Sequence, residues 1–121
     1  MSLYSDTLTI ASRLRTDATI KALVKGNIFP VVATRGANGA HPIIVYRNAG
    51  RVSPESKDGG LIRAFEVRVA STSYETTLKT ADAVAACLSE NEDPCCELSG
   101  YDELFELEEE TYVFTLVFSI N

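Results

Sequence analysis

Basic residues are missing from the last third of this 121-residue chain. All 11 lysines and arginines lie between Arg13 and Lys79, whereas residues 80–121 carry 11 acidic side chains and no basic one. Residues 1–79 carry 6 acidic side chains, so the two parts have formal charges of +5 and −11 within a net charge of −6. Tight binding to nucleic acid needs Lys and Arg to neutralise phosphates, and the acidic total argues against it. The asymmetry suits head-to-tail contacts between identical subunits, unless folding interleaves the two parts.

Long apolar runs are missing as well. No stretch approaches the roughly 18 apolar residues of a membrane span, and the N-terminus shows no apolar core of a signal peptide. The three cysteines, Cys87, Cys95 and Cys96, are an odd number, and two of them are adjacent, which is a poor basis for a disulfide framework. We therefore expect a protein of a reducing cytoplasm, without membrane contact, whose cysteines act as small apolar residues.

The residues of common catalytic and cofactor sites are scarce. His41 is the only histidine and stands before Pro42 in a predicted loop, and Cys87 falls on a predicted helix with no matching motif nearby. Cys95 and Cys96 lack the C-x-x-C spacing of a zinc site, and no phosphate-binding G-x-x-x-x-G-K-[ST] occurs. We predict that the chain is not an enzyme and needs no cofactor.

One acidic stretch before the last strand could suggest an enzyme, because paired carboxylates can hold a divalent cation. The alternating Glu-Leu-Glu order fits better with a hairpin whose polar side lies in water, or with a charged interaction surface. We predict an acidic surface and no metal site. Its residues are Asp102, Glu103, Glu106, Glu108, Glu109 and Glu110.

Helical spacing and capping residues predict one broken helix or two short ones in the first 25 residues, with Ser5 or Asp6 as the first cap and Gly26 after the last turn. The chain then alternates short strands with one further helix, and we predict a single domain over residues 1–121. The expected fold class is α+β, a two-layer sandwich with a mainly antiparallel sheet of about four strands and two main helices on one face. The later elements are a short extended piece at 27–30, strands at 42–50 and 61–72, a helix within 71–89, and a hairpin over 95–120 that turns around Glu108–Glu110.

The last strand is apolar on both sides, which is unusual for a half-solvated sheet. One side carries Tyr112, Phe114, Leu116, Phe118 and Ile120, and the other carries Val113, Thr115, Val117 and Ser119. The strand at 42–50 shows the same property. Because the predicted helices can cover only one face, we expect the other face to bind a partner, most simply another subunit. The predicted interface consists of Val113, Thr115, Val117, Ile44 and Tyr46, with Ser53, Pro54 and Lys57 from a loop that orders on assembly.

The order of these elements carries a resemblance. A helical N-terminus leads through "ALVKGNIFP" and a loop to "HPIIVYRNAG", then to "LIRAFEVRVASTSYETTLKTADAVAACL", and the chain closes on "ETYVFTLVFSI". The "IFP" element, the P-x-x-V-Y strand and the S-Y-x-x-x entry to the helix match best. Over nearly its whole length the chain resembles the phage tail-completion or tail-terminator-like family of tailed phages and prophages.

The resemblance implies a structural role without an active site. Such proteins are thought to form rings, often hexameric, that cap the tail tube and join it to the head. The expected partners are therefore other copies of the chain and other tail or head-tail connector proteins, in the virion tail after assembly and in the host bacterial cytoplasm before it. DNA would pass through the ring without tight binding, because an acidic inner rim repels phosphates.

Two other functions stay open on the residues alone. A small cytoplasmic adaptor could bind a partner protein through the same open sheet face. A metal-dependent hydrolase would use the acidic stretch.

Overall fold

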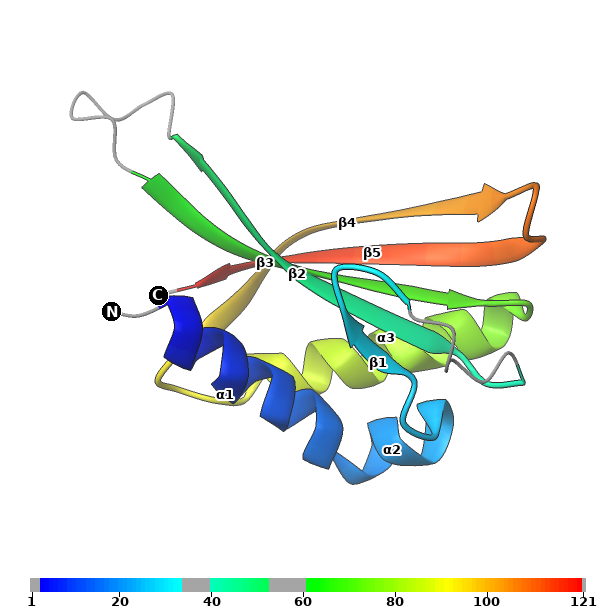
Figure 1. The fold of residues 1–121 in the computed structure, drawn as a ribbon, viewed down its shortest axis with the longest axis horizontal. Helices are drawn as coiled ribbons and strands as arrows, with labels where there is room; N and C mark the ends of the chain where they lie inside the picture. Colours follow the sequence, from blue (N-terminus) through cyan, green and yellow to red (C-terminus); the bar gives the residue numbers. More distant parts are fainter. Residues whose placement is uncertain (1–2, 34–39, 53–60, 121) are drawn as a thin grey trace.

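The computed structural model describes residues 3–33, 40–52 and 61–120, and they form an α+β fold (Figure 1). The predicted fold class is confirmed. The described residues form three helices and five strands, where about four strands and two main helices were expected. In this described part of the chain, no helix is long and apolar enough to cross a membrane. The elements are α1 (Leu3–Thr16), α2 (Ala18–Val24), β1 (Ile28–Pro30), β2 (Ile43–Val52), β3 (Leu61–Ser71), α3 (Tyr74–Ser89), β4 (Cys96–Glu106) and β5 (Thr111–Ile120).

The helix boundaries follow from capping residues. Asp17 separates α1 from α2, because its side chain accepts a hydrogen bond from the Ile20 N–H at 3.0 Å. Lys25, with a φ of 50°, takes the left-handed conformation that ends α2, and Gly26, predicted to follow the last turn, also has a positive φ of 89°. Ser73 caps α3 by accepting from the Thr76 N–H at 3.3 Å. The first helix differs from the prediction, since it begins at Leu3 and not after a cap at Ser5 or Asp6.

The strand order in the sheet is β1-β2-β3-β5-β4, so β1 and β4 are its two edges. β1 pairs with β2 in parallel, and every other pairing is antiparallel. The three strands from the basic part of the chain therefore lie together, and the two strands from the acidic part lie together beside them. Folding does not interleave the two charged parts within the sheet.

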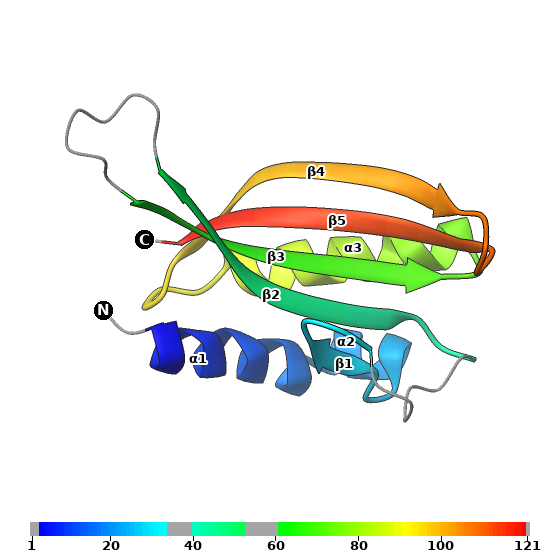
Figure 2. The same ribbon diagram turned by 45° about the horizontal axis from the view of Figure 1, so that its top comes forward.

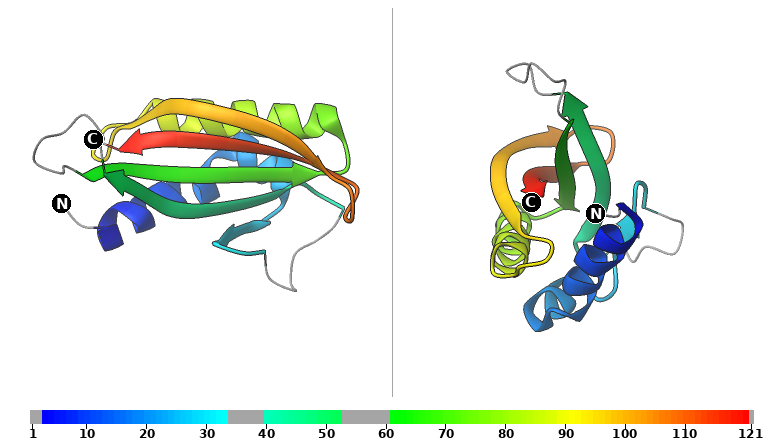
Figure 3. Two further views of the ribbon diagram at one scale, coloured as in Figure 1. Left: turned by 90° about the horizontal axis from the view of Figure 1, so that it is seen from above. Right: turned by 90° about the vertical axis from the view of Figure 1, so that its left-hand side faces the viewer.

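All three helices lie on one side of the sheet (Figures 1 and 3). α3 packs under β3, β5 and β4, and it also contacts α1 and α2. Burying a large apolar side chain is worth roughly 1.5–3 kcal/mol, so this layer contributes most of the folding free energy. Its largest fully buried side chains are Phe65, Phe118, Ile10, Leu14, Ile20, Ile44, Leu88, Leu116, Val24, Val67, Val69 and Val84.

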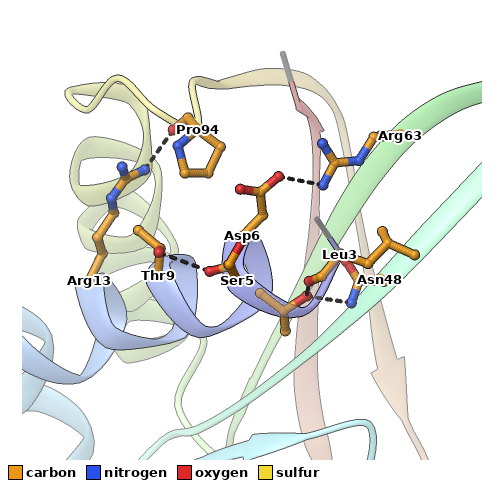
Figure 4. A network of polar contacts seen from close by, with 9 residues as sticks. Leu3, Ser5, Asp6, Thr9, Arg13, Asn48, Arg63 and Pro94 are labelled. Carbon is orange, nitrogen blue, oxygen red and sulfur yellow. Dashed lines mark hydrogen bonds and ion pairs between the residues drawn. The ribbon is translucent and has the colours of Figure 1, made fainter. Parts of the chain in front are cut away.

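Polar contacts fix α1 against the sheet and against the segment after α3 (Figure 4). Asp6 pairs with Arg63 of β3 at 2.7 Å, and both side chains are largely buried. Asn48 of β2 donates a hydrogen bond to the Thr7 hydroxyl at 2.8 Å. Arg13 donates to the Pro94 carbonyl at 2.7 Å, which ties the helix to the entrance of β4. The helical layer is thus attached to the sheet at both ends of α1.

Candidate assembly surfaces

The last strand has one face under the helices and one face that no element of the described chain covers. Leu116, Phe118 and Ile120 are buried on the helix side, while Val113 and Val117 are half-buried on the other. The side of β5 that the pattern predicted to face the helices is confirmed. Figure 2 shows the sheet with α3 behind it.

The strand register aligns the uncovered side chains of four strands into rows. One row is apolar from end to end and consists of Ile43, Ala70, Val113 and Leu104. The next row contains Val45, Arg68, Thr115 and Asp102. The first row is a continuous apolar stripe across the sheet, which is the feature expected of a surface that binds another protein.

Two residues predicted for this surface lie in the core instead. Ile44 is 0% exposed and Tyr46 is 6% exposed, and both face the helices. Tyr46 stacks on Phe65 with ring centroids 5.7 Å apart, and its hydroxyl accepts a hydrogen bond from Arg15 at 3.1 Å. The prediction that Ile44 and Tyr46 form a subunit interface is therefore wrong for this fold. Both sides of β2 carry apolar residues, so the sequence pattern could not show which side the helices cover.

Ser53, Pro54 and Lys57 were also predicted for the interface. They lie outside the described residues, between β2 and β3.

Charged residues of β2 and β3 lie beside the apolar stripe. Glu66 accepts hydrogen bonds from Arg47 at 2.8 Å and from Arg68 at 3.3 Å. The hydrogen bond to Glu66 raises the pKa of Arg47. The Arg47 and Arg68 side chains are 50% and 56% exposed, so these pairs contribute little to folding. They leave two cations on the uncovered face.

The predicted acidic residues are all exposed, but they divide among three places. Asp102 and Glu106 lie on the uncovered face, opposite Thr115 and Thr111 of β5. Glu103 lies on the helix side, where its two oxygens accept from the Tyr74 hydroxyl at 3.1 and 3.0 Å. That hydrogen bond raises the pKa of Tyr74. Within the described ranges, no three His, Cys, Asp or Glu side chains are placed to hold a metal ion together. The remaining three, Glu108, Glu109 and Glu110, form the turn between β4 and β5.

The sequence did not predict a groove between α3 and the edge strand β4. It consists of two adjoining hollows of about 240 and 310 Å³ that share Phe114 in their walls. Tyr101 stacks on Phe114 with ring centroids 5.6 Å apart, and Phe105 meets Tyr112 edge-on at 4.9 Å. Tyr101, Glu103 and Phe105 alternate along β4 and therefore share one face of the strand. The sequence alone did not indicate an aromatic surface there, because most neighbouring residues of this strand are acidic.

The cysteines show none of the activation that a nucleophile requires. Burial raises the pKa of Cys87 to about 11, and Asp17 adds to this effect. Burial also raises the pKa of Cys96. A catalytic thiol needs a lowered pKa, and burial shifts the pKa of both groups in the opposite direction. Cys87 instead donates a weak hydrogen bond to the Arg13 carbonyl at 3.4 Å, which joins α3 to α1.

The fold is similar to that of one chain in the solved structure of the virion of a native gene transfer agent (GTA) particle. The match covers 92% of this chain and 89% of that chain, with a TM-score of 0.66 and 17% sequence identity. At this identity the likeness shows a shared fold. No protein-family model and no curated protein sequence matches the chain.

Proposed function

We propose that the chain is a structural, non-enzymatic subunit of a phage-like particle. In this proposal its copies form a ring that completes or terminates the tail tube and joins the tube to the head. The observation that carries the proposal is the fold shared with a chain of a GTA virion over nearly the whole length of both chains. The uncovered sheet face supports it, because a particle subunit needs surfaces that only assembly covers.

The apolar stripe is the part of this face best suited to assembly. Ile43, Val113 and Leu104 present aliphatic side chains side by side on strands held in register by backbone pairing. A surface built on paired strands binds without having to order itself first, which lowers the entropic cost of association. We assign contacts with neighbouring components of the particle to this stripe, to Val117 and Thr115 beside it, and to the predicted loop residues Ser53, Pro54 and Lys57.

The acidic strand supports the idea that DNA passes without binding. Asp102 and Glu106 are exposed on the uncovered face, and the turn at Glu108–Glu110 adds three carboxylates at its end. Where these side chains line a channel, they repel phosphates. The proposal therefore places the acidic side of the sheet toward the channel of the ring.

A genetic test separates this function from others. In cells that produce the particle, loss of the chain is expected to give heads without joined tails, or tails of uncontrolled length, and wild-type chain should restore normal particles. Val117→Asp puts a charge on the uncovered face without touching the core, and it should fold but fail to restore them. The matched control is Leu8→Asp, on an exposed position of α1, which should restore particles fully. Normal particles in the absence of the chain would contradict the proposal.

The same sheet face would serve a cytoplasmic adaptor, and fractionation distinguishes the two. A particle subunit sediments with purified particles in a fixed copy number per particle. An adaptor stays in the supernatant, bound to a partner that is not a particle protein.

A further inference from the structure

The two edges of the sheet carry side chains of opposite charge. β4 forms one edge and β1 the other, and the left view of Figure 3 shows them on opposite sides of the molecule. The β4 edge bears the aromatic groove and carboxylates. The β1 edge bears exposed valines and cations. Each edge thus has what the other lacks.

The groove at the β4 edge is open to solvent. Tyr101 is 71% exposed although it stacks on Phe114, and Leu98 and Phe105 are exposed along the same strand. Two carboxylates belong to its walls, Asp82 from α3 and Glu103 from β4. A ligand of this groove therefore needs apolar side chains with cations beside them.

The β1 edge ends in a protrusion of two valines. Val31 and Val32 are 70% and 65% exposed. The Val32 N–H donates to the Pro30 carbonyl at 2.6 Å, and Val31 between them has a φ of 63°. This is a γ-turn of the rare, strained kind, and a β-branched residue is unfavourable at positive φ. Backbone strain of this type is concentrated at binding sites, because it fixes a side chain in a set direction.

Cations surround the same edge. Arg15, Lys21 and Lys25 line a hollow of about 280 Å³ together with Gly26 and Ile28, directly before and within β1. In the described part of the chain, no carboxylate forms an ion pair with these three residues. The Val31 N–H donates to the Tyr46 carbonyl at 2.8 Å, and Arg15 lies over the Tyr46 ring at 5.6 Å, so Tyr46 holds both the protrusion and one of the three cations.

We propose that the β1 edge of one copy docks onto the β4 edge of a second copy. Val31 and Val32 enter the groove between α3 and β4, and Lys21 and Lys25 face Asp82 and Glu103. The contact uses two different surfaces, so it is head-to-tail, and repetition of it closes a ring or extends a filament. This contact rests on the proposed function, since it supplies the lateral interface of that ring.

A second copy fits better than a foreign segment because both halves of the match are present on one chain. The apolar protrusion meets an apolar groove, and three cations meet two carboxylates, without any contact that needs a different sequence. Opposite charges across a contact speed encounter and fix its orientation. The same pairing keeps the uncovered face free for the other components of the particle.

The test uses purified full-length chain and sedimentation velocity over a concentration series up to about 1 mM, where even an interaction of about −4 kcal/mol is detected. Wild type should self-associate, and association should weaken with salt because screening removes the charge attraction. Val32→Asp alters the protrusion and Tyr101→Asp alters the groove, both at exposed positions. Each variant alone should associate at least about tenfold more weakly than wild type. Leu8→Asp, away from both edges, should associate like wild type.

Mixing the two variants gives the decisive result. Val32→Asp keeps an intact groove and Tyr101→Asp keeps an intact protrusion, so an equimolar mixture should form a dimer of one chain of each kind and grow no further. Wild type that stays monomeric throughout, variants that associate like wild type, or a mixture that fails to pair would each overturn the contact. The proposed function is tested separately by the presence of the chain in particles. Presence there with failed pairing would refute only this interface.

Discussion

Both faces of the sheet carry apolar side chains, but the helices of the described chain cover only one of them (Figure 3). On the covered face, Leu116 and Phe118 are completely buried, and polar contacts attach the helices above them. On the uncovered face, Val113 and Val117 alternate with these residues on the same strand and remain half-exposed. An apolar pattern on both sides of a strand therefore does not by itself show which side the helices of the monomer cover.

The two adjacent isoleucines of β2 give the sharpest test of this difference, and the largest expected effect. Ile44→Ala empties a fully buried position and should lower the free energy of unfolding by about 3–4 kcal/mol, as for other core truncations. Ile43→Ala removes the same atoms from the uncovered face and should cost about 1 kcal/mol or less. Urea unfolding of the two variants measures both values. Equal losses would mean that the two faces are not distinct in the monomer.

Ion pairs on the two faces should differ in the same direction. Asp6→Ala leaves Arg63 without its partner in a largely buried position, where the Arg63 Nε already has no hydrogen-bond partner in the described chain. The expected loss is about 1–3 kcal/mol. Arg47→Ala breaks an exposed pair with Glu66 on the uncovered face and should cost about 0.5 kcal/mol or less. Chemical denaturation measures both losses in the free energy of unfolding. An equal loss in the two variants would show that the ion pairs on the two faces do not differ in their contribution to stability.

The buried thiol on the covered side predicts a pH effect. The pKa of Cys87 is raised from 9.0 to about 11 in the folded state, so the unfolded chain loses this proton first as the pH rises. The stabilisation is present below pH 9 and is lost between about pH 9 and 11, by on the order of 1–2 kcal/mol. Comparison with Cys87→Ala isolates this contribution, because other groups titrate equally in both proteins. Parallel stability curves for the two proteins across this range would show that Cys87 is not protected by folding.

Most of the elements could be predicted from the sequence because their determinants are local. Asp17 and Ser73 act as caps within three residues of the groups they bind, and Gly26 supplies a positive φ where α2 ends. The alternation in β5 also identified its buried face, since Phe114 and Phe118 are much larger than the residues between them. The number of strands was underestimated by one, because the three residues of β1 form a strand only through parallel pairing with β2.

The candidate site was predicted only in part, because it depends on long-range placement. Ile43 and Ile44 are the same residue type in neighbouring positions, and only the helix layer decides which one is buried. The groove beside β4 requires α3 to run along an edge strand, and strand order cannot be read from alternation. The separation of basic and acidic strands likewise follows from the strand order β1-β2-β3-β5-β4. The charge count alone could not show whether folding interleaves the two parts of the chain.

Hydroxyl-radical footprinting of the free chain and of purified particles tests the central claim most directly. We expect Val113 and Val117 to be labelled in the free chain and protected in particles, and Ile44 and Phe118 to be protected in both. Equal labelling of Val113 and Val117 in the two samples, or absence of the chain from the particles, would contradict it.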